Sequence, residues 1–214
     1  MRVLLETITF LILLNIYWLN NARRIYLKRR LGVGIVMNLK MTARNIALML
    51  CPERSFKIYG DISSIKNGGI LYSIHFGTWE LMPNLLQKSL KKDIGILVNR
   101  YTENNPHLIG RLMDKFFYIW RTRKKVKVFY PDEVFKIVRF LKKGGIFAAL
   151  VDGDTLYAKL KKIEKLSKLC HVPLHPFALY YDGANYIMEI DCNIDGVLKH
   201  RPFDYWWFYK SRRK

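Results

Sequence analysis

The chain has 214 residues, of which half are apolar and a quarter are charged. This length and apolar content suffice to bury one sizeable core, which excludes a disordered protein and predicts a single domain with appendages. Lysine and arginine number 37 against 17 aspartate and glutamate residues, a formal net charge of +20. Such an excess indicates a negative partner: a polyanion, an anionic membrane surface or an acidic protein. The cysteines Cys51, Cys170 and Cys192 lack CxxC spacing, which argues against a disulfide framework or a zinc module and suits a reducing compartment.

An apolar stretch runs from Val3 to Leu19 and ends in the interface-favouring residues Tyr17 and Trp18. A spanning helix needs about 20 apolar residues, so the stretch favours a shallow or monotopic anchor, with an ordinary buried helix as the alternative. Basic residues that suit anionic headgroups follow it, and by the positive-inside rule they hold the downstream chain in the cytoplasm: Arg23, Arg24, Lys28, Arg29 and Arg30. We therefore expect a membrane-anchoring helix with its basic flank over residues 1–34 and one α/β domain over residues 35–214.

Beyond the basic flank, the apolar pattern alternates between helical and strand periods. Helices are predicted over residues 37–50, 81–90, 106–120, 132–141 and 156–169. Strands are predicted over residues 70–74, 94–98, 126–130 and 146–151, and a hairpin over 172–181 and 186–190. This alternation predicts an α/β fold with a mixed, mostly parallel sheet flanked by helices and an antiparallel edge at the end of the chain.

The sharpest local signal lies directly after the first predicted strand, where ligands collect in open α/β sheets. There His75 is followed five positions later by Glu80. A histidine takes up a proton near neutral pH, and a carboxylate on its other nitrogen fixes the tautomer. On one continuous helix the two side chains would lie about 140° apart, so they meet only if the chain turns between them, which Gly77 permits. Thr78 is predicted to cap a helix that begins at Trp79; a surface histidine before an ordinary helix start is the alternative.

The segment His75-Phe76-Gly77-Thr78-Trp79-Glu80 resembles the HxGxWE form of the H-x4-D/E motif of the lysophospholipid acyltransferase superfamily, nearest its lipid A late acyltransferase (lauroyl/myristoyl transferase) branch. Four further segments resemble that branch in the same order, so the resemblance covers nearly the whole chain. They are Asn99-Arg100 with Asn105-Pro106 and Arg111, Gly144-Gly145 with Val151-Asp152, the passage from Lys168 to Pro176, and the tryptophan-rich basic stretch from Pro202 to Lys214. The chain departs from the pattern after Asp152, where the connector Gly153-Asp154-Thr155 is shorter than the family's loop near the acyl pocket.

The resemblance implies transfer of a fatty acyl chain from an acyl carrier protein or CoA thioester to a hydroxyl of a lipid A precursor or a related lipid or glycolipid. It places the enzyme at the cytoplasmic face of the bacterial inner membrane, with no metal and no cofactor besides the thioester co-substrate. His75 is expected to be the general base, and Glu80 is expected to orient it and balance its charge. Arg100 suits a phosphate or the developing oxyanion, with a strand-end salt bridge as its alternative. Further substrate-binding residues are expected at Gly77, Thr78, Arg121, Arg123 and Asp152.

Several alternatives stay open. The shortened connector is compatible with a degenerate relative that binds anionic lipid without catalysis. A nucleic-acid-binding module is suggested only by charge and aromatic content, and because no helix-turn-helix, zinc or RNP-like pattern accompanies them we expect no nucleic-acid partner. The basic residues around Arg121 and Arg123 form either a phosphate or carrier-protein site or a solvated turn. His171 and His175 lack a third ligand at metal spacing and are expected to be core or surface histidines.

Overall fold

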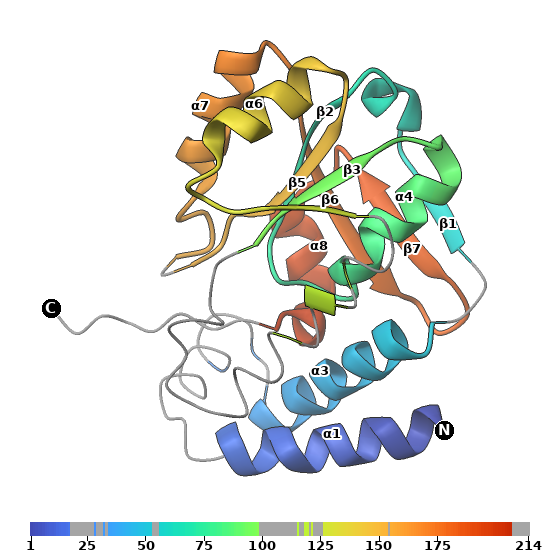
Figure 1. The fold of residues 1–214 in the computed structure, drawn as a ribbon. Coiled ribbons are helices and arrows are strands. Elements are labelled where there is room, and N and C mark those ends of the chain that lie inside the picture. The colour runs from blue at the N-terminus through green and yellow to red at the C-terminus, as the bar shows by residue number, and fades with distance from the viewer. Residues whose placement is uncertain are drawn as a thin grey trace, which may run out of the picture.

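The computed structural model describes residues 1–17, 28, 32, 34–52, 56–98, 115, 118–119, 121, 126–153 and 155–206. Its centre is a sheet of seven strands in the order β1-β7-β6-β2-β5-β3-β4 (Figure 1). The strands are β1 (Phe56–Tyr59), β2 (Gly69–Ser73), β3 (Ile94–Leu97), β4 (Lys127–Phe129), β5 (Ile146–Leu150), β6 (Leu174–Tyr181) and β7 (Tyr186–Ile190). Strands β2 to β6 are parallel, and β7 is antiparallel to β6 and parallel to β1. The predicted mixed, mostly parallel sheet is therefore confirmed.

Helices cover both faces of this sheet because successive strand residues point to opposite sides. On β2, for example, Ile70 and Leu71 are both fully buried but belong to different hydrophobic clusters. The cluster around Leu71 packs under α4 (Met82–Leu90) and the end of α3 (Ile35–Leu50). The cluster around Ile70 packs under α6 (Val134–Lys142), α7 (Leu160–Cys170) and α8 (Ile194–His200). The helices cover the two faces of the sheet and leave the carboxyl ends of β2 and β5 to the loops that follow them.

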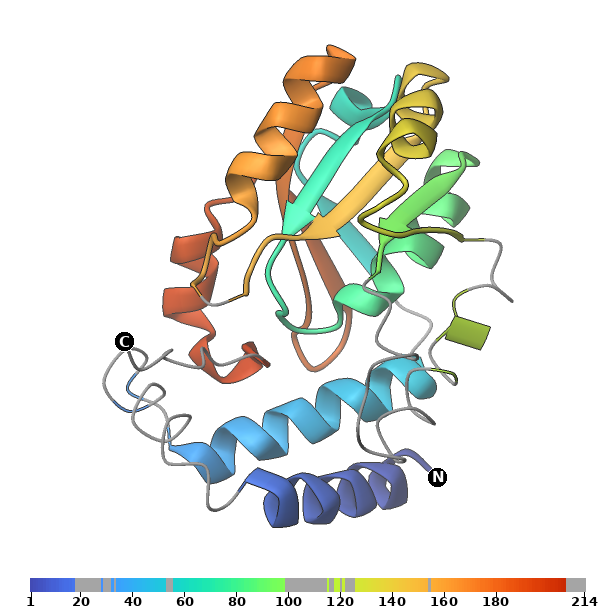
Figure 2. The same cartoon turned by 60° about the vertical axis from the view of Figure 1, so that its left-hand side comes forward.

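A pair of helices lies beyond the carboxyl ends of the parallel strands. Helix α1 (Arg2–Tyr17) packs along α3, and Figures 1 and 2 show the two side by side below the sheet. One side of α1 presents apolar side chains to solvent: Val3, Leu4, Ile8, Leu11 and Ile12. Among the described helices, none combines the length and apolar character needed to cross a membrane.

Most predicted elements are found, with boundaries that differ from the prediction by at most four residues. Strand β1 (four residues) and helix α8 (seven residues) were not predicted from the sequence. The hairpin β6–β7 is antiparallel as expected, but its placement at the sheet edge is wrong, because β1 pairs with β7 on the outside. The helix predicted over residues 106–120 falls largely outside the described residues.

Candidate active site

The register of two neighbouring strands brings His75 and Asp152 together. Strands β2 and β5 pair in parallel with Ser73 opposite Leu150, and each polar residue lies two positions beyond its strand end. The Nδ1 atom of His75 is 2.8 Å from Oδ1 of Asp152, and the His75 backbone N–H donates to Oδ2 at 3.1 Å. The Asp152 side chain is fully buried, whereas 20% of the His75 side chain is exposed. A carboxylate at Nδ1 favours the tautomer with its proton there, which leaves Nε2 as the ring nitrogen that can accept a proton.

Aromatic residues surround this pair. The Trp79 ring meets the His75 ring edge-on at a centroid separation of 5.0 Å, and Trp206 meets Trp79 at 4.4 Å. The Tyr205 hydroxyl donates to Oδ2 of Asp152 at 3.4 Å. Contacts of this kind restrict the imidazole to one orientation and bury the carboxylate that supports it. The participation of Tyr205 and the pairing of Asp152 with His75 were not anticipated from the sequence.

Glu80 has a different partner from the one expected. Its carboxylate accepts two hydrogen bonds from the Arg121 guanidinium, from Nε at 2.9 Å and from Nη2. Both side chains are largely buried, with 9% of Glu80 and 18% of Arg121 exposed. The short 3₁₀ turn Trp79–Leu81 carries Glu80 to Arg121, while the strand register supplies Asp152 to His75. In the described structure, the residue that orients His75 is therefore Asp152, which corrects the expected His75–Glu80 pair.

Gly77 and Thr78 shape the backbone of this loop. Gly77 makes the predicted turn with φ of +58°, and a Cβ there would lie 2.1 Å from the Leu179 carbonyl oxygen, so only glycine fits. Thr78 donates its backbone N–H to the same oxygen at 2.9 Å. Its hydroxyl makes no hydrogen bond in the described structure, so the predicted side-chain cap is absent. Both residues are buried and lie outside the described lining of the cleft that His75 borders.

This cleft has a volume of about 740 Å³ and opens at the carboxyl edge of the sheet. Residues at the ends of β3 and β5, such as Leu97 and Leu150, form part of its wall together with His75. Large apolar side chains line much of the remainder: Met49, Met82, Ile96, Phe177 and Trp206. Cationic groups also reach it, from Lys115, Arg121, Lys159 and Lys162. Of the other predicted binding residues, Asp152 supports His75 instead of lining the cleft, and Arg100 and Arg123 lie outside the described residues.

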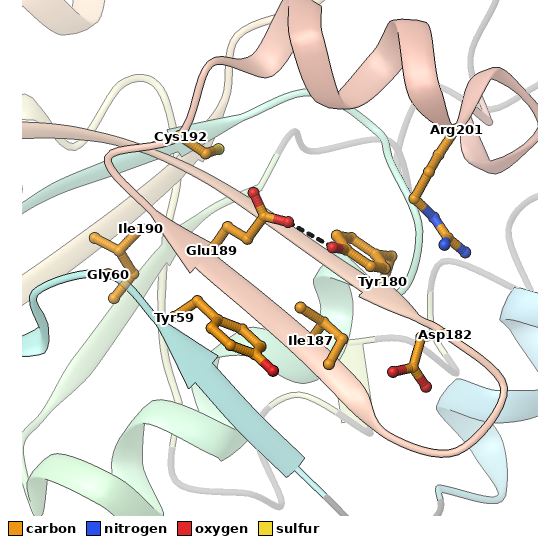
Figure 3. A pocket seen from close by; sticks show the side chains of 9 residues that line it. All are labelled: Tyr59, Gly60, Tyr180, Asp182, Ile187, Glu189, Ile190, Cys192 and Arg201. Carbon is orange, nitrogen blue, oxygen red and sulfur yellow. Dashed lines mark hydrogen bonds between the residues drawn. The ribbon is translucent and has the colours of Figure 1, made fainter.

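A second hollow of about 560 Å³ lies over β1, β6 and β7 (Figure 3). In it the Glu189 carboxylate accepts a hydrogen bond from the Tyr180 hydroxyl, and the Arg201 guanidinium lies 4.3 Å from the Tyr180 ring centre. Burial, reinforced by the nearby Glu189 carboxylate, raises the pKa of the Cys192 thiol to about 12. The thiol is therefore protonated near neutral pH and a poor nucleophile. Glu189 and Arg201 both contact Tyr180, and the Cys192 thiol is unreactive, so the described lining of the hollow offers no reactive centre.

Metal binding has no support in the described residues, which contain no group of three or more histidine, cysteine or acidic side chains arranged to hold an ion. His175 is buried on β6, and its Nδ1 lies 2.8 Å from Oδ1 of Asp191. His171 is exposed at the end of α7. The described chain thus contains a second His–Asp pair that lies outside the cleft lining.

No model of a known protein family matches the chain, and no curated protein matches it.

Proposed function

We propose that the protein is a membrane-associated O-acyltransferase. It transfers a fatty acyl chain from an acyl carrier protein or CoA thioester to a hydroxyl of a lipid A precursor or a related lipid or glycolipid. The observation that carries this proposal is the His75–Asp152 pair, held at 2.8 Å on the wall of a cleft lined by large apolar side chains. The motif resemblance of the His75–Glu80 segment supplies the reaction class.

The chemistry needs a base and no redox step. As the acceptor oxygen attacks the thioester carbonyl carbon, Nε2 of His75 takes the hydroxyl proton, and the Asp152 carboxylate stabilises the resulting imidazolium. The tetrahedral intermediate then collapses with cleavage of the carbon–sulfur bond. The departing thiolate recovers the proton from His75, which leaves an ester, a free thiol and the enzyme in its starting state.

The lining of the cleft suits both parts of such substrates. Its apolar walls suit a fatty acyl chain, because burial of hydrocarbon is favourable by about 0.8 kcal/mol per methylene group. The ammonium and guanidinium groups of Lys159, Lys162 and Arg121 suit a phosphate on the acceptor or on the donor. The ion pair between Glu80 and Arg121 fixes the guanidinium at the cleft wall beside His75.

The surroundings of the cleft suit a lipid surface. Helix α3 contributes Met49 to the cleft lining and packs against α1, whose exposed face is apolar. Short apolar helices of this kind lie in the membrane interface, and the net charge of +20 favours anionic headgroups. The family resemblance implies the cytoplasmic face of a bacterial inner membrane, and we propose that α1 holds the enzyme there.

Lipid analysis of cells that lack the protein tests this proposal. Cells that lack the protein should contain a lipid with one acyl chain fewer than normal. Expression of the wild type or of His175→Gln should restore the missing chain, whereas expression of His75→Ala should not. His175→Gln is the matched control, because it also removes a His–Asp pair but outside the cleft. Wild-type turnover by purified His75→Ala protein would exclude His75 as the base. An unchanged lipid profile, together with vesicle binding that is indifferent to His75 and Glu80, would favour a lipid-binding protein without catalysis.

A further inference from the structure

Three residues near the end of the described chain tie the loop of His75 to the rest of the molecule. We call Asp204, Tyr205 and Trp206 the 204–206 bridge. The Trp206 N–H donates to the His75 carbonyl oxygen at 2.8 Å, and the Gly77 N–H donates to the Asp204 carbonyl oxygen at 2.9 Å. Between these bonds, the backbones of Phe76 and Tyr205 pair in antiparallel fashion. The bridge therefore fixes the backbone on which His75 stands.

The Tyr205 side chain extends this support to the carboxylate. Tyr205 and Asp152 are 0% and 1% exposed, and the tyrosine hydroxyl donates to Oδ2 while Oδ1 faces His75 Nδ1. The His75 backbone N–H shares Oδ2. A buried carboxylate needs several donors, and donors on one oxygen stop it from rotating. The hydroxyl thus helps to direct Oδ1 at the imidazole.

Helix α3 holds the bridge from the other side through two buried asparagines. Asn38 donates its side-chain amide to the Tyr205 carbonyl oxygen at 2.6 Å, and Asn45 donates to Oδ1 of Asp204 at 3.1 Å. The two asparagines are 0% and 1% exposed and lie two helical turns apart, so they share one face of α3. Burying two amides costs free energy unless they form hydrogen bonds. Here each amide donates a hydrogen bond to the bridge.

We propose that Tyr205 is a positioning residue: it fixes the Asp152 carboxylate that sets the tautomer of His75, and Asn38 on α3 fixes Tyr205. The catalytic meaning of this arrangement rests on the proposed acyl transfer. The tautomer of His75 is independent of the proposed function, and it can be observed without any substrate. The bridge thereby connects the helix layer at the carboxyl edge to the proposed base.

The first experiment compares Tyr205→Phe with Tyr186→Phe by ¹⁵N NMR of the histidine rings, at a pH where His75 is neutral. Tyr186 is the matched control: it is fully buried, and its hydroxyl also donates to α3, to the Leu48 carbonyl oxygen at 2.9 Å. Wild type and Tyr186→Phe should show His75 with its proton on Nδ1. Tyr205→Phe should show a mixture of the two tautomers. A wild-type pattern in Tyr205→Phe, or an Nε2–H tautomer in the wild type, would overturn the proposal.

Kinetics supply the second readout. Tyr205→Phe should lower kcat roughly three- to tenfold, the loss expected for one ordinary hydrogen bond, because the bond to Asp152 is long at 3.4 Å, with KM unchanged. Asn38→Ala should act in the same direction and give the same mixture of tautomers, and if this variant does not fold, Tyr205→Phe still decides. A tautomer mixture in a protein whose wild type transfers no acyl chain would support the positioning by Tyr205 and contradict the proposed function. An unchanged kcat in Tyr205→Phe, with acyl transfer established in the wild type, would contradict the positioning alone.

Discussion

The two carboxylates near the proposed base, those of Asp152 and Glu80, have different partners. Asp152 is fully buried against Nδ1 of His75, while Glu80 binds the guanidinium of Arg121 at the cleft wall. The difference follows from where each stands. Asp152 extends a strand that pairs with the strand before His75, so the register delivers it to the imidazole, whereas Glu80 sits on a turn that directs it elsewhere. Removing the two charges should therefore have different consequences.

Asp152→Asn should abolish most turnover while leaving the protein folded. The amide cannot stabilise an imidazolium and favours the wrong tautomer, so we expect turnover to fall on the order of a thousandfold or more. Steady-state kinetics with a thioester donor measure this loss, and circular dichroism confirms folding. A variant that retains more than about a tenth of wild-type turnover would show that Asp152 is not the partner on which catalysis depends.

Glu80→Gln should instead act mainly on stability. It leaves the largely buried Arg121 guanidinium without a compensating charge, so we expect the free energy of unfolding to fall by about 2–3 kcal/mol. Urea denaturation measures the change. Lys136→Gln is a useful comparison, because its ion pair with Glu133 is mostly exposed on the lysine side and should contribute less than about 1 kcal/mol. Equal losses in the two variants would contradict a buried structural ion pair at Glu80.

Helix α1 carries more large apolar side chains than its packing against α3 can bury. Its contact with α3 leaves Leu4 64%, Ile8 47% and Leu11 51% exposed. Large apolar side chains concentrated on one side of a helix indicate an interaction surface. A lipid interface at this position would lie beside the cleft, because α3 lines the cleft through Met49.

The double variant Leu4→Ser and Ile8→Ser should bind vesicles that contain phosphatidylglycerol at least tenfold more weakly, since each apolar side chain contributes about 1.5–3 kcal/mol when buried. Phe135→Ser is the matched control, because Phe135 is 91% exposed on α6 and not on α1. Vesicle co-sedimentation gives both affinities. Undiminished binding of the double variant would show that the exposed face of α1 does not contact lipid.

At the level of elements, the sequence was informative wherever an apolar period was long enough. The spacing of Leu160, Ile163 and Leu166 identifies α7, and the apolar runs that became β2 and β5 are unmistakable. Pairing between strands is not encoded in such local patterns, so nothing showed that the ends of β2 and β5 are adjacent. The local spacing and the motif resemblance therefore both indicate Glu80 as the partner of His75, although Asp152 follows its strand at the same two-residue distance as His75.

For the whole molecule, buried cysteine and tyrosine side chains determine how the free energy of unfolding responds to alkaline pH. Burial raises the pKa of the Cys192 thiol to about 12 from an ordinary 9.0, and burial also raises the pKa values of Tyr157, Tyr180 and Tyr186 above the ordinary 10.0. Above about pH 9 the folded chain holds protons that the unfolded chain has lost. Because the folded state then binds more protons, the free energy of unfolding decreases as pH rises.

Urea denaturation at pH 8, 9.5 and 10.5 should therefore show a progressive loss of stability in the wild type. Cys192→Ala should lose less between pH 8 and 10.5, since it removes one of the groups that release a proton on unfolding. Cys51→Ala is the control for removal of a thiol elsewhere in the chain, because Cys51 lies outside the described lining of the hollow that contains Glu189 and Cys192. A free energy of unfolding that does not change over this pH range would contradict the raised pKa values of the Cys192 thiol and the three tyrosine hydroxyls.

The 204–206 bridge also has a consequence for synthesis of the protein. During translation α1 and α3 precede the sheet, yet the side-chain hydrogen bonds of Asn38 and Asn45 end on Tyr205 and Asp204, more than 150 residues later. Both helices are therefore synthesised before the strands of the sheet, which all follow them in the chain. The proposed base acquires its full support only when the last described residues arrive, so a prematurely terminated chain carries His75 without the means to hold it.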